Sequence, residues 1–207
     1  LEENQVKETD EIVEEYEKLN KISNFQAGTY YLKESMNLKE ITEMLQTGKM
    51  YDPNQITITY LEGKPMWWLA KTISEKTNNT EEDVYDVLKN EEYIDKLIDK
   101  YWFITDEIKN KNIYYSLEGY LFPDTYAISN ADAKVEEIFE KMLDRMEEVL
   151  EPYKQKIDDN KYTIHQLLTL ASIVETEGMY REDRLNIASV FYNRLERNMS
   201  LGSCVNN

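Results

Sequence analysis

Residues 56–73 read ITITYLEGKPMWWLAKTI, and the hydrophobic pattern changes its period within this stretch. Residues 56–60 alternate isoleucine and threonine, the period-2 pattern of a half-buried strand. After a turn signal at Glu62 and Gly63, apolar residues recur at the spacing of one helix face: Met66, Leu69, Ala70 and Ile73. A strand that leads through a tight turn into an amphipathic helix predicts an α+β fold.

The segments before this stretch repeat the same order. Residues 2–20 are strongly charged, with apolar residues at near-helical spacing, and predict a solvated helix in a segment that ends near residue 24. Residues 28–32 have strand character, and a helix is expected to begin after Asn37 and end at Gly48.

The segments that follow are mainly helical. Thr80 and Asp83 have the spacing of a capping box, and a further short helix is expected near 93–101. Residues 114–128 break the helical pattern and predict extended chain and a turn, so we place a boundary near residue 112. Beyond it, helices are expected at about 132–150, 163–177 and 181–198, the second ending at Gly178.

Composition limits the chemistry of this chain. It has 207 residues and a formal net charge of −17, and it lacks the basic stripe with which proteins contact phosphates, so no nucleic-acid partner is expected. The single cysteine, Cys204, excludes an internal disulfide, and the single histidine, His165, excludes a histidine-based metal cluster. We therefore expect neither metal nor cofactor, and carboxylates are the plentiful reactive groups.

Glu175 does not fit its surroundings. Thr163 and Gln166 have the spacing of a capping box, which sets the phase of the helix at 163–177. Glu175 then falls inside one apolar stripe, which comprises Ile164, Leu167, Leu168, Ala171 and Val174. Burial and the negative end of the helix dipole both disfavour a charged carboxylate, so the stripe predicts a protonated glutamate suited to general acid catalysis. The alternative is that Glu175 meets solvent or an arginine such as Arg181.

Three segments of the chain carry a resemblance to a known family. They read LEGYLFPDTY at residues 117–126, LASIVETE at 170–177 and SVFYNRL at 189–195. In order and spacing they resemble the YceG-like endolytic murein transglycosylases, the MltG family. More loosely, the strand and helix of residues 56–73 are similar to the LysM-like subdomain of that family.

The resemblance implies a fold and an activity. The fold would be a LysM-like strand–helix subdomain with additional helices at 25–112, joined to a mainly helical catalytic domain with a few short strands at 113–207. The enzyme would be extracytoplasmic, attached to the bacterial cell membrane by a single anchor upstream of this chain. It would cut nascent glycan strands of peptidoglycan internally, leaving 1,6-anhydro-N-acetylmuramic acid ends, and would meet cell-wall synthesis proteins.

Glu175 matches the catalytic glutamate of the family. In that chemistry one glutamate first protonates the leaving oxygen and then accepts the proton of the attacking 6-hydroxyl, so no second carboxylate is needed. Glu118, Glu177, Tyr192 and Asn193 are the candidate substrate-binding residues. Each has a structural alternative: Glu118 as the anchor of a turn, Tyr192 in helix packing, and Glu177 as a solvated surface charge.

Two further interpretations use the same residues differently. The chain could bind peptidoglycan as a non-catalytic scaffold for cell-wall synthesis, or it could be a cytosolic helical adaptor, which would leave the three segments unexplained. The family usually continues beyond residue 198 with a Ser/Thr-Asp-Pro-Thr element and a stretch that closes the substrate groove. This chain reads LGSCVNN at residues 201–207, with Cys204 about where the aspartate is usual.

Overall fold

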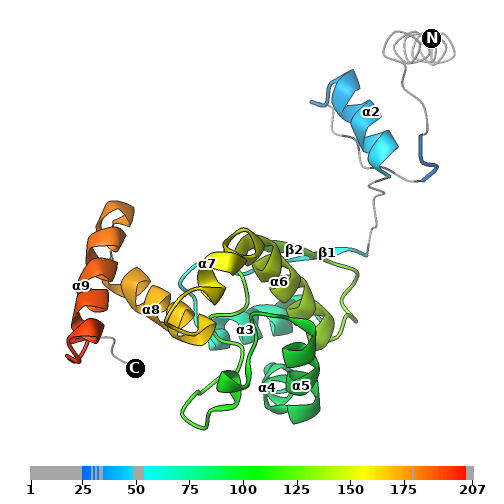
Figure 1. The fold of residues 1–207 in the computed structure, drawn as a ribbon. Coiled ribbons are helices and arrows are strands. Elements are labelled where there is room, and N and C mark those ends of the chain that lie inside the picture. Colours follow the sequence, from blue (N-terminus) through cyan, green and yellow to red (C-terminus); the bar gives the residue numbers. More distant parts are fainter. Residues whose placement is uncertain are drawn as a thin grey trace, which may run out of the picture. The chain divides into compact units, whose positions relative to one another are not determined.

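The computed structural model describes residues 25–28, 30, 32, 35–48, 54–178 and 180–203. The chain divides into two units, Leu1–Pro53 and Asn54–Asn207 (Figure 1). The helix expected within residues 1–24 lies outside the described residues. In the part of the chain that the structure describes, no helix is long and apolar enough to cross a membrane.

The first unit contains helix α2 (Leu38–Thr47), which has the predicted ends. Asn37 Oδ1 accepts the Glu40 N–H at 3.0 Å, and Glu40 Oε2 accepts the Asn37 N–H at 2.9 Å, so each side chain satisfies an orphan donor. Gly48 ends the helix with a left-handed φ of +67°, which favours glycine. The strand expected at 28–32 lies partly outside the described residues, and its described positions are not in a strand.

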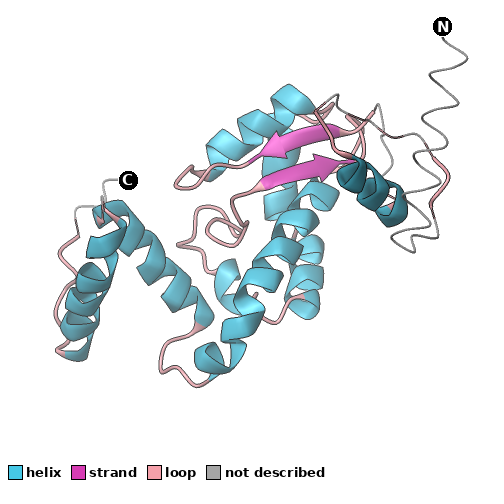
Figure 2. Cartoon of the chain, turned by 90° about the horizontal axis from the view of Figure 1, so that it is seen from above, coloured by secondary structure: helices cyan, strands magenta, loops and turns pink. Residues whose placement is uncertain are grey.

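The second unit is an α+β fold, as predicted, with one small sheet and several helices (Figure 2). Its elements, in chain order, are β1 (Ile56–Thr59), α3 (Met66–Lys76), α4 (Glu81–Lys89), α5 (Glu91–Lys100), η1 (Asp106–Lys109), β2 (Thr125–Ile128), α6 (Val135–Leu150), η2 (Glu151–Tyr153), α7 (Lys154–Asp158), α8 (Ile164–Glu177), η3 (Arg181–Asp183) and α9 (Arg184–Glu196).

The two strands pair antiparallel, and their register places apolar side chains on one face. Ile58 lies opposite Tyr126, and both are buried. On the outer face, Thr59 and Thr125 lie opposite each other with their hydroxyl oxygens 3.0 Å apart. The period-2 alternation of the sequence is therefore confirmed by the burial of the strands.

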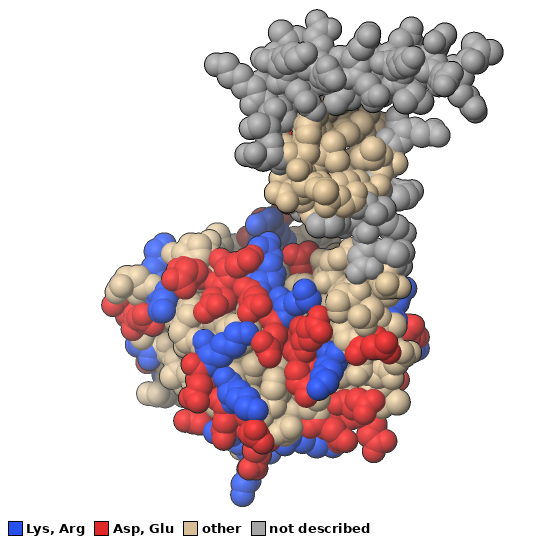
Figure 3. Space-filling view, turned by 90° about the vertical axis from the view of Figure 1, so that its right-hand side faces the viewer, with Lys and Arg blue, Asp and Glu red and all other residues tan. Residues whose placement is uncertain are grey.

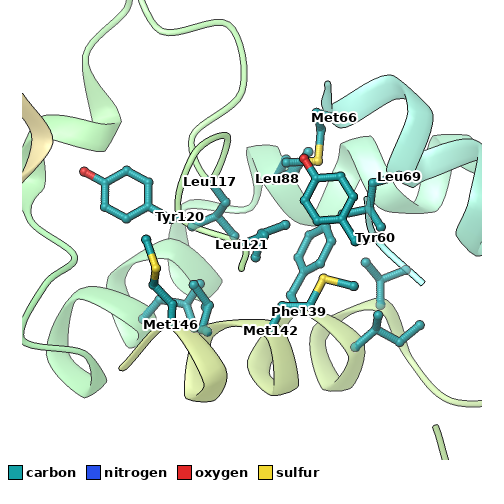
Figure 4. Close-up of a cluster of buried hydrophobic side chains, with 14 of the residues drawn as sticks. Tyr60, Met66, Leu69, Leu88, Leu117, Tyr120, Leu121, Phe139, Met142 and Met146 are labelled. Atoms are coloured by element: carbon teal, nitrogen blue, oxygen red, sulfur yellow. The ribbon is translucent and has the colours of Figure 1, made fainter. Parts of the chain in front are cut away.

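The core of this unit lies between the sheet, helices α3–α5 and helix α6 (Figure 4). Helix α6 buries side chains at the spacing of one helix face: Val135, Ile138, Phe139, Met142, Leu143 and Met146. Tyr101 is fully buried, and its hydroxyl donates to Asp144 Oδ1 at 2.5 Å. Core residues come from both sides of residue 112, for example Leu97 and Phe139. The domain ranges 25–112 and 113–207 stay predictions.

Charged side chains of both signs cover the surface of the second unit. On the face drawn in Figure 3, acidic and basic side chains are interspersed rather than segregated. The pairs on exposed helix faces include Lys96 with Glu92 at 2.8 Å. Such exposed pairs contribute little to stability individually, so the hydrophobic core is the main source of stability.

Burial raises the pKa of Tyr60 to about 12, and the nearby carboxylate of Glu118 adds to the increase. The Tyr60 hydroxyl donates to the Lys64 carbonyl at 2.6 Å and is therefore held in its neutral form. Burial also raises the pKa values of other core tyrosines, among them Tyr93, Tyr101, Tyr120 and Tyr126.

We predict that the protein loses stability as the pH rises above 10. Between pH 10 and 12 the unfolded chain releases the Tyr60 proton while the folded protein keeps it, so the free energy of unfolding falls by about 1 kcal/mol per pH unit from this group. Tyr60→Phe should flatten that fall. Urea denaturation at pH 9, 10 and 11 measures it, with Tyr153→Phe, at an exposed tyrosine, as the control. Parallel pH curves for wild type and Tyr60→Phe would contradict the assignment.

Candidate active site

Helix α8, which carries Glu175, begins at a capping box, as predicted. The Gln166 N–H donates to Thr163 Oγ1 at 3.3 Å, and the Thr163 N–H donates to Gln166 Oε1 at 3.1 Å. Ile164, the first residue of α8, is buried in the main core, and Leu168 packs against that core one turn later. The first half of α8 therefore packs against the body of the unit.

Two polar contacts attach the start of α8 to distant parts of the chain. Tyr120 Oη and His165 Nδ1 share a hydrogen bond of 2.9 Å, and the two rings are nearly parallel. The Thr163 hydroxyl donates to Glu107 Oε1 at 3.1 Å. No sequence pattern indicates these contacts, because they join residues more than forty positions apart.

The second half of α8 packs against a different neighbour, helix α9. Leu170 and Val174 of α8 form a small buried cluster with Phe191 of α9. Figures 1 and 2 both show this helix pair at one end of the unit. The buried face of α8 therefore changes along the helix, from Ile164 and Leu168 at its start to Leu170 and Val174 near its end.

Glu175 is exposed, so the predicted burial of its side chain is wrong. Its side chain retains 42% of its accessible surface, and Ala171, one turn earlier, is exposed as well. Glu175 does follow Leu168 on the helix wheel, as the sequence predicts, but it lies two turns beyond the point where that face meets the core. The alternative interpretation is the correct one: Glu175 is exposed to solvent and lies near an arginine.

The arginine beside Glu175 is Arg184, at the start of α9. Nη2 of Arg184 lies 4.0 Å from Oε1 of Glu175, the limit of an ion pair. Nε of Arg184 is buried and has no hydrogen-bond partner. Arg181, the arginine suggested by the sequence, is not the partner, and only the fold distinguishes it from Arg184.

Gly178 allows the chain to turn close to Arg184. Its N–H donates to the Val174 carbonyl at 2.8 Å and ends α8 at the predicted position. A Cβ atom at residue 178 would lie 2.9 Å from that carbonyl oxygen and 3.0 Å from Cγ of Arg184. A larger residue at position 178 would therefore force the backbone near Val174, the Arg184 side chain or both to shift.

Glu118 caps helix α3. Its Oε1 accepts the Met66 N–H at 2.8 Å, whereas Pro65, at the N-cap position, makes no side-chain cap. A carboxylate at the positive end of a helix dipole is favourable. No hydrogen bond or ion pair within the described residues joins Glu118 to Glu175. Glu118 therefore has a structural contact, as in the alternative of a turn anchor, and this contact is with the first turn of α3.

The other three candidate residues lie on α8 and α9. Glu177 Oε1 accepts the Ser203 hydroxyl at 2.6 Å. Tyr192 is half-buried, and its ring lies 5.7 Å from that of Tyr162. Asn193 is exposed. It follows Arg184 by nine residues, so the helical rise places it about 13 Å along α9 from the partner of Glu175.

The described ranges contain no group of three or more histidine, cysteine, aspartate or glutamate side chains arranged to hold a metal ion. Near the end of α8 the structure places an accessible carboxylate beside a guanidinium. A carboxylate that reaches solvent can exchange protons with a bound substrate.

Comparison with known proteins gives a consistent match. Residues 1–206 match the model of the YceG-like family. A Bacillus subtilis protein named endolytic murein transglycosylase is 37% identical over 202 residues, covering 97% of this chain and 56% of its own length. A Streptococcus pneumoniae protein of the same name is 35% identical over 198 residues, covering 91% of this chain and 36% of its own length.

A solved structure is also similar. A YceG-like protein from Listeria monocytogenes superposes with a TM-score of 0.68 at 32% sequence identity, covering 94% of this chain and 64% of that one. The chain therefore spans about half or less of the length of the two named relatives, and less than two thirds of the crystallised protein.

We predict that Glu118→Ala destabilises the protein by about 1–2 kcal/mol, because α3 loses the side-chain cap that Glu118 gives its first turn. Glu118→Gln should cost less, since the amide oxygen can accept the same hydrogen bond without the charge. Urea denaturation at pH 7 measures both. Glu62→Ala, at an exposed position in the turn before α3, is the matched control and should change stability by less than about 0.5 kcal/mol. Equal effects of Glu118→Ala and Glu62→Ala would exclude the cap.

Proposed function

Since the chain belongs to the YceG-like family, we propose that it is part of an endolytic murein transglycosylase. The proposed reaction cuts peptidoglycan glycan strands internally at the bond between N-acetylmuramic acid and N-acetylglucosamine. It leaves 1,6-anhydro-N-acetylmuramic acid ends. The observation that carries the proposal is the position of Glu175, an accessible carboxylate in the last turn of α8 within a segment that resembles the catalytic segment of the family.

In the proposed mechanism Glu175 acts twice. Its carboxylic acid first donates a proton to the glycosidic oxygen, so that N-acetylglucosamine leaves with both bonding electrons. The resulting carboxylate then takes the proton of the muramyl 6-hydroxyl as that oxygen bonds to the anomeric carbon. Glu175 ends with the proton it began with, and no water is consumed.

Arg184 is the group that positions Glu175 in this proposal. Its guanidinium is close enough to attract the carboxylate but, at 4.0 Å, does not form a short hydrogen bond that would block access to it. Its buried Nε and the close approach at Gly178 limit its movement. The guanidinium therefore lies beside the carboxylate and leaves it open to a substrate.

The remaining assignments are also proposals. Tyr192, Asn193 and Glu177 would contact the glycan along α8 and α9, and Glu118 would contact it only if the substrate reaches the start of α3. The LysM-like assignment rests on the order of β1 and α3. A membrane anchor upstream, extracytoplasmic action and contact with cell-wall synthesis proteins follow from the family resemblance.

We predict that Glu175→Gln lowers turnover by about 10²- to 10⁴-fold while glycan binding persists, because the amide cannot exchange a proton. The assay digests uncrosslinked glycan strands and identifies the product ends by mass spectrometry. Glu182→Gln makes the same change of charge at an exposed residue of η3 and should retain activity.

Three outcomes of this assay would contradict the proposal. Reducing ends formed by water would indicate a hydrolase. Intact strands retained by the wild-type chain would support the non-catalytic scaffold. Equal activity of Glu175→Gln and Glu182→Gln would remove Glu175 from the reaction.

A further inference from the structure

The second unit contains a cavity of about 840 Å³ at a place distinct from Glu175. Its lining comes from the end of α4, the start of α5, η1 and the loop that follows η1. No residue of α8 or α9 lines it. A volume of several hundred cubic ångströms is the usual size of a site for a small ligand.

The floor of this cavity is apolar and belongs to the core. Leu88 of α4, Ile94 of α5 and Ile108 of η1 line it, and each is almost completely buried. Because these side chains are packed from behind, the floor is held in place without a ligand. The cavity is therefore a preformed depression rather than a gap between loose loops.

Three tyrosines form one wall of the cavity. The rings of Tyr85 and Tyr115 are nearly parallel, with centroids 5.6 Å apart, and Tyr114 meets Tyr115 edge-on at 4.7 Å. Tyr114 is 87% exposed, and it is the most exposed of the large apolar or aromatic side chains in the described residues. An exposed aromatic ring that contacts one neighbouring ring edge-on presents an apolar face beside polar hydroxyl groups.

The rim of the cavity carries lysines, although the chain is strongly acidic. Lys89 and Lys111 line it, and neither makes an ion pair within the described residues. Lys109 also lines it, but its ammonium group forms ion pairs with Asp95 at 2.5 Å and Asp106 at 2.9 Å, so these carboxylates compensate its charge. The available positive charge at the rim therefore comes from Lys89 and Lys111. Of the two acidic residues that line the cavity, Asp95 pairs with Lys109, and Glu91 makes no ion pair with a lysine within the described residues.

We propose that this cavity, which we call the tyrosine pocket, binds a sugar ring that carries a carboxylate. The C–H face of a pyranose ring is apolar and can stack on a tyrosine ring, and its hydroxyl groups can bond to the polar rim. The carboxylate would be attracted by Lys89 and Lys111. A flat apolar ligand would not use the lysines, and a purely ionic ligand would not use the tyrosine wall.

The source of such a sugar rests on the proposed function, whereas the pocket itself does not. In peptidoglycan, N-acetylmuramic acid carries a lactyl carboxylate, and N-acetylglucosamine does not. The pocket would therefore hold a muramyl residue of the same or a neighbouring strand at a place away from the cutting site.

The experiment compares two disaccharides that differ mainly in this carboxylate. The 207-residue chain carrying Glu175→Gln, which prevents turnover, is titrated with chitobiose and with the disaccharide of N-acetylglucosamine and N-acetylmuramic acid. Backbone amide shifts in NMR spectra report which residues respond. We expect shifts at the tyrosine pocket for both ligands, with tighter and more salt-sensitive binding of the carboxylated one.

Three variants test the two parts of the pocket separately. Tyr114→Ala should weaken both ligands about tenfold, since one stacking face is lost. Lys89→Gln combined with Lys111→Gln should remove the preference for the carboxylated ligand and leave chitobiose unchanged. Tyr153→Ala, an exposed tyrosine with Lys156 near its ring, is the matched control and should bind as the parent does. All replaced side chains are exposed, so the variants should fold.

Several results would overturn the inference. These are the absence of amide shifts at the pocket with either disaccharide, equal binding by Tyr114→Ala and Tyr153→Ala, and a response to a single-stranded oligonucleotide but to neither sugar. Because binding is measured without turnover, each of these outcomes leaves the proposed function standing. Conversely, loss of cleavage in the strand assay leaves the pocket result unaffected.

Discussion

The antiparallel pairing of β1 with β2 is the constraint on which the second unit depends. It brings residues 56–59 against residues 125–128, so the helices encoded between them must fold back over one face of the sheet. Closing so long a segment costs conformational entropy, and burial of the shared core offsets that cost. The Glu118 cap on α3 lies within the closed segment and sets the start of a helix encoded far earlier in the chain. Disruption of the β1–β2 pairing would therefore destabilise the whole core.

Helix α8 connects this core to the candidate active site. Its first half is fixed by the core and by the contacts of Thr163 and His165, and its second half packs mainly against α9. The helix thus carries Glu175 outward from a rigid base to a place where solvent and Arg184 are its neighbours. A rigid helix that ends in an accessible carboxylate is a suitable arrangement for proton transfer to a bulky polymer, since a deep cavity would exclude a long strand.

The negative charge of the chain affects which ligands can approach it. A net charge of −17 repels an acidic glycan at long range, and screening by salt limits that repulsion to short distances. The proposed contact with an acidic strand would therefore depend on local positive charge, which Arg184 offers near Glu175 and Lys89 and Lys111 offer at the tyrosine pocket. At the tyrosine pocket the lysines stand beside aromatic rings, whereas on the face shown in Figure 3 charges of both signs are interspersed.

The local elements follow from the amino-acid sequence alone, because capping boxes, turn residues and hydrophobic periods act over a few residues. The helix starts at Asn37, Thr80 and Thr163, the strand at Ile56 and the phase of Glu175 on its helix follow from such short-range patterns. Which neighbour each helix face meets depends on the folded arrangement of the whole unit. The exposure of Glu175, its pairing with Arg184 and the capping of α3 by Glu118 depend on contacts between distant segments. A helix wheel treats the whole helix as facing one partner, whereas α8 has two.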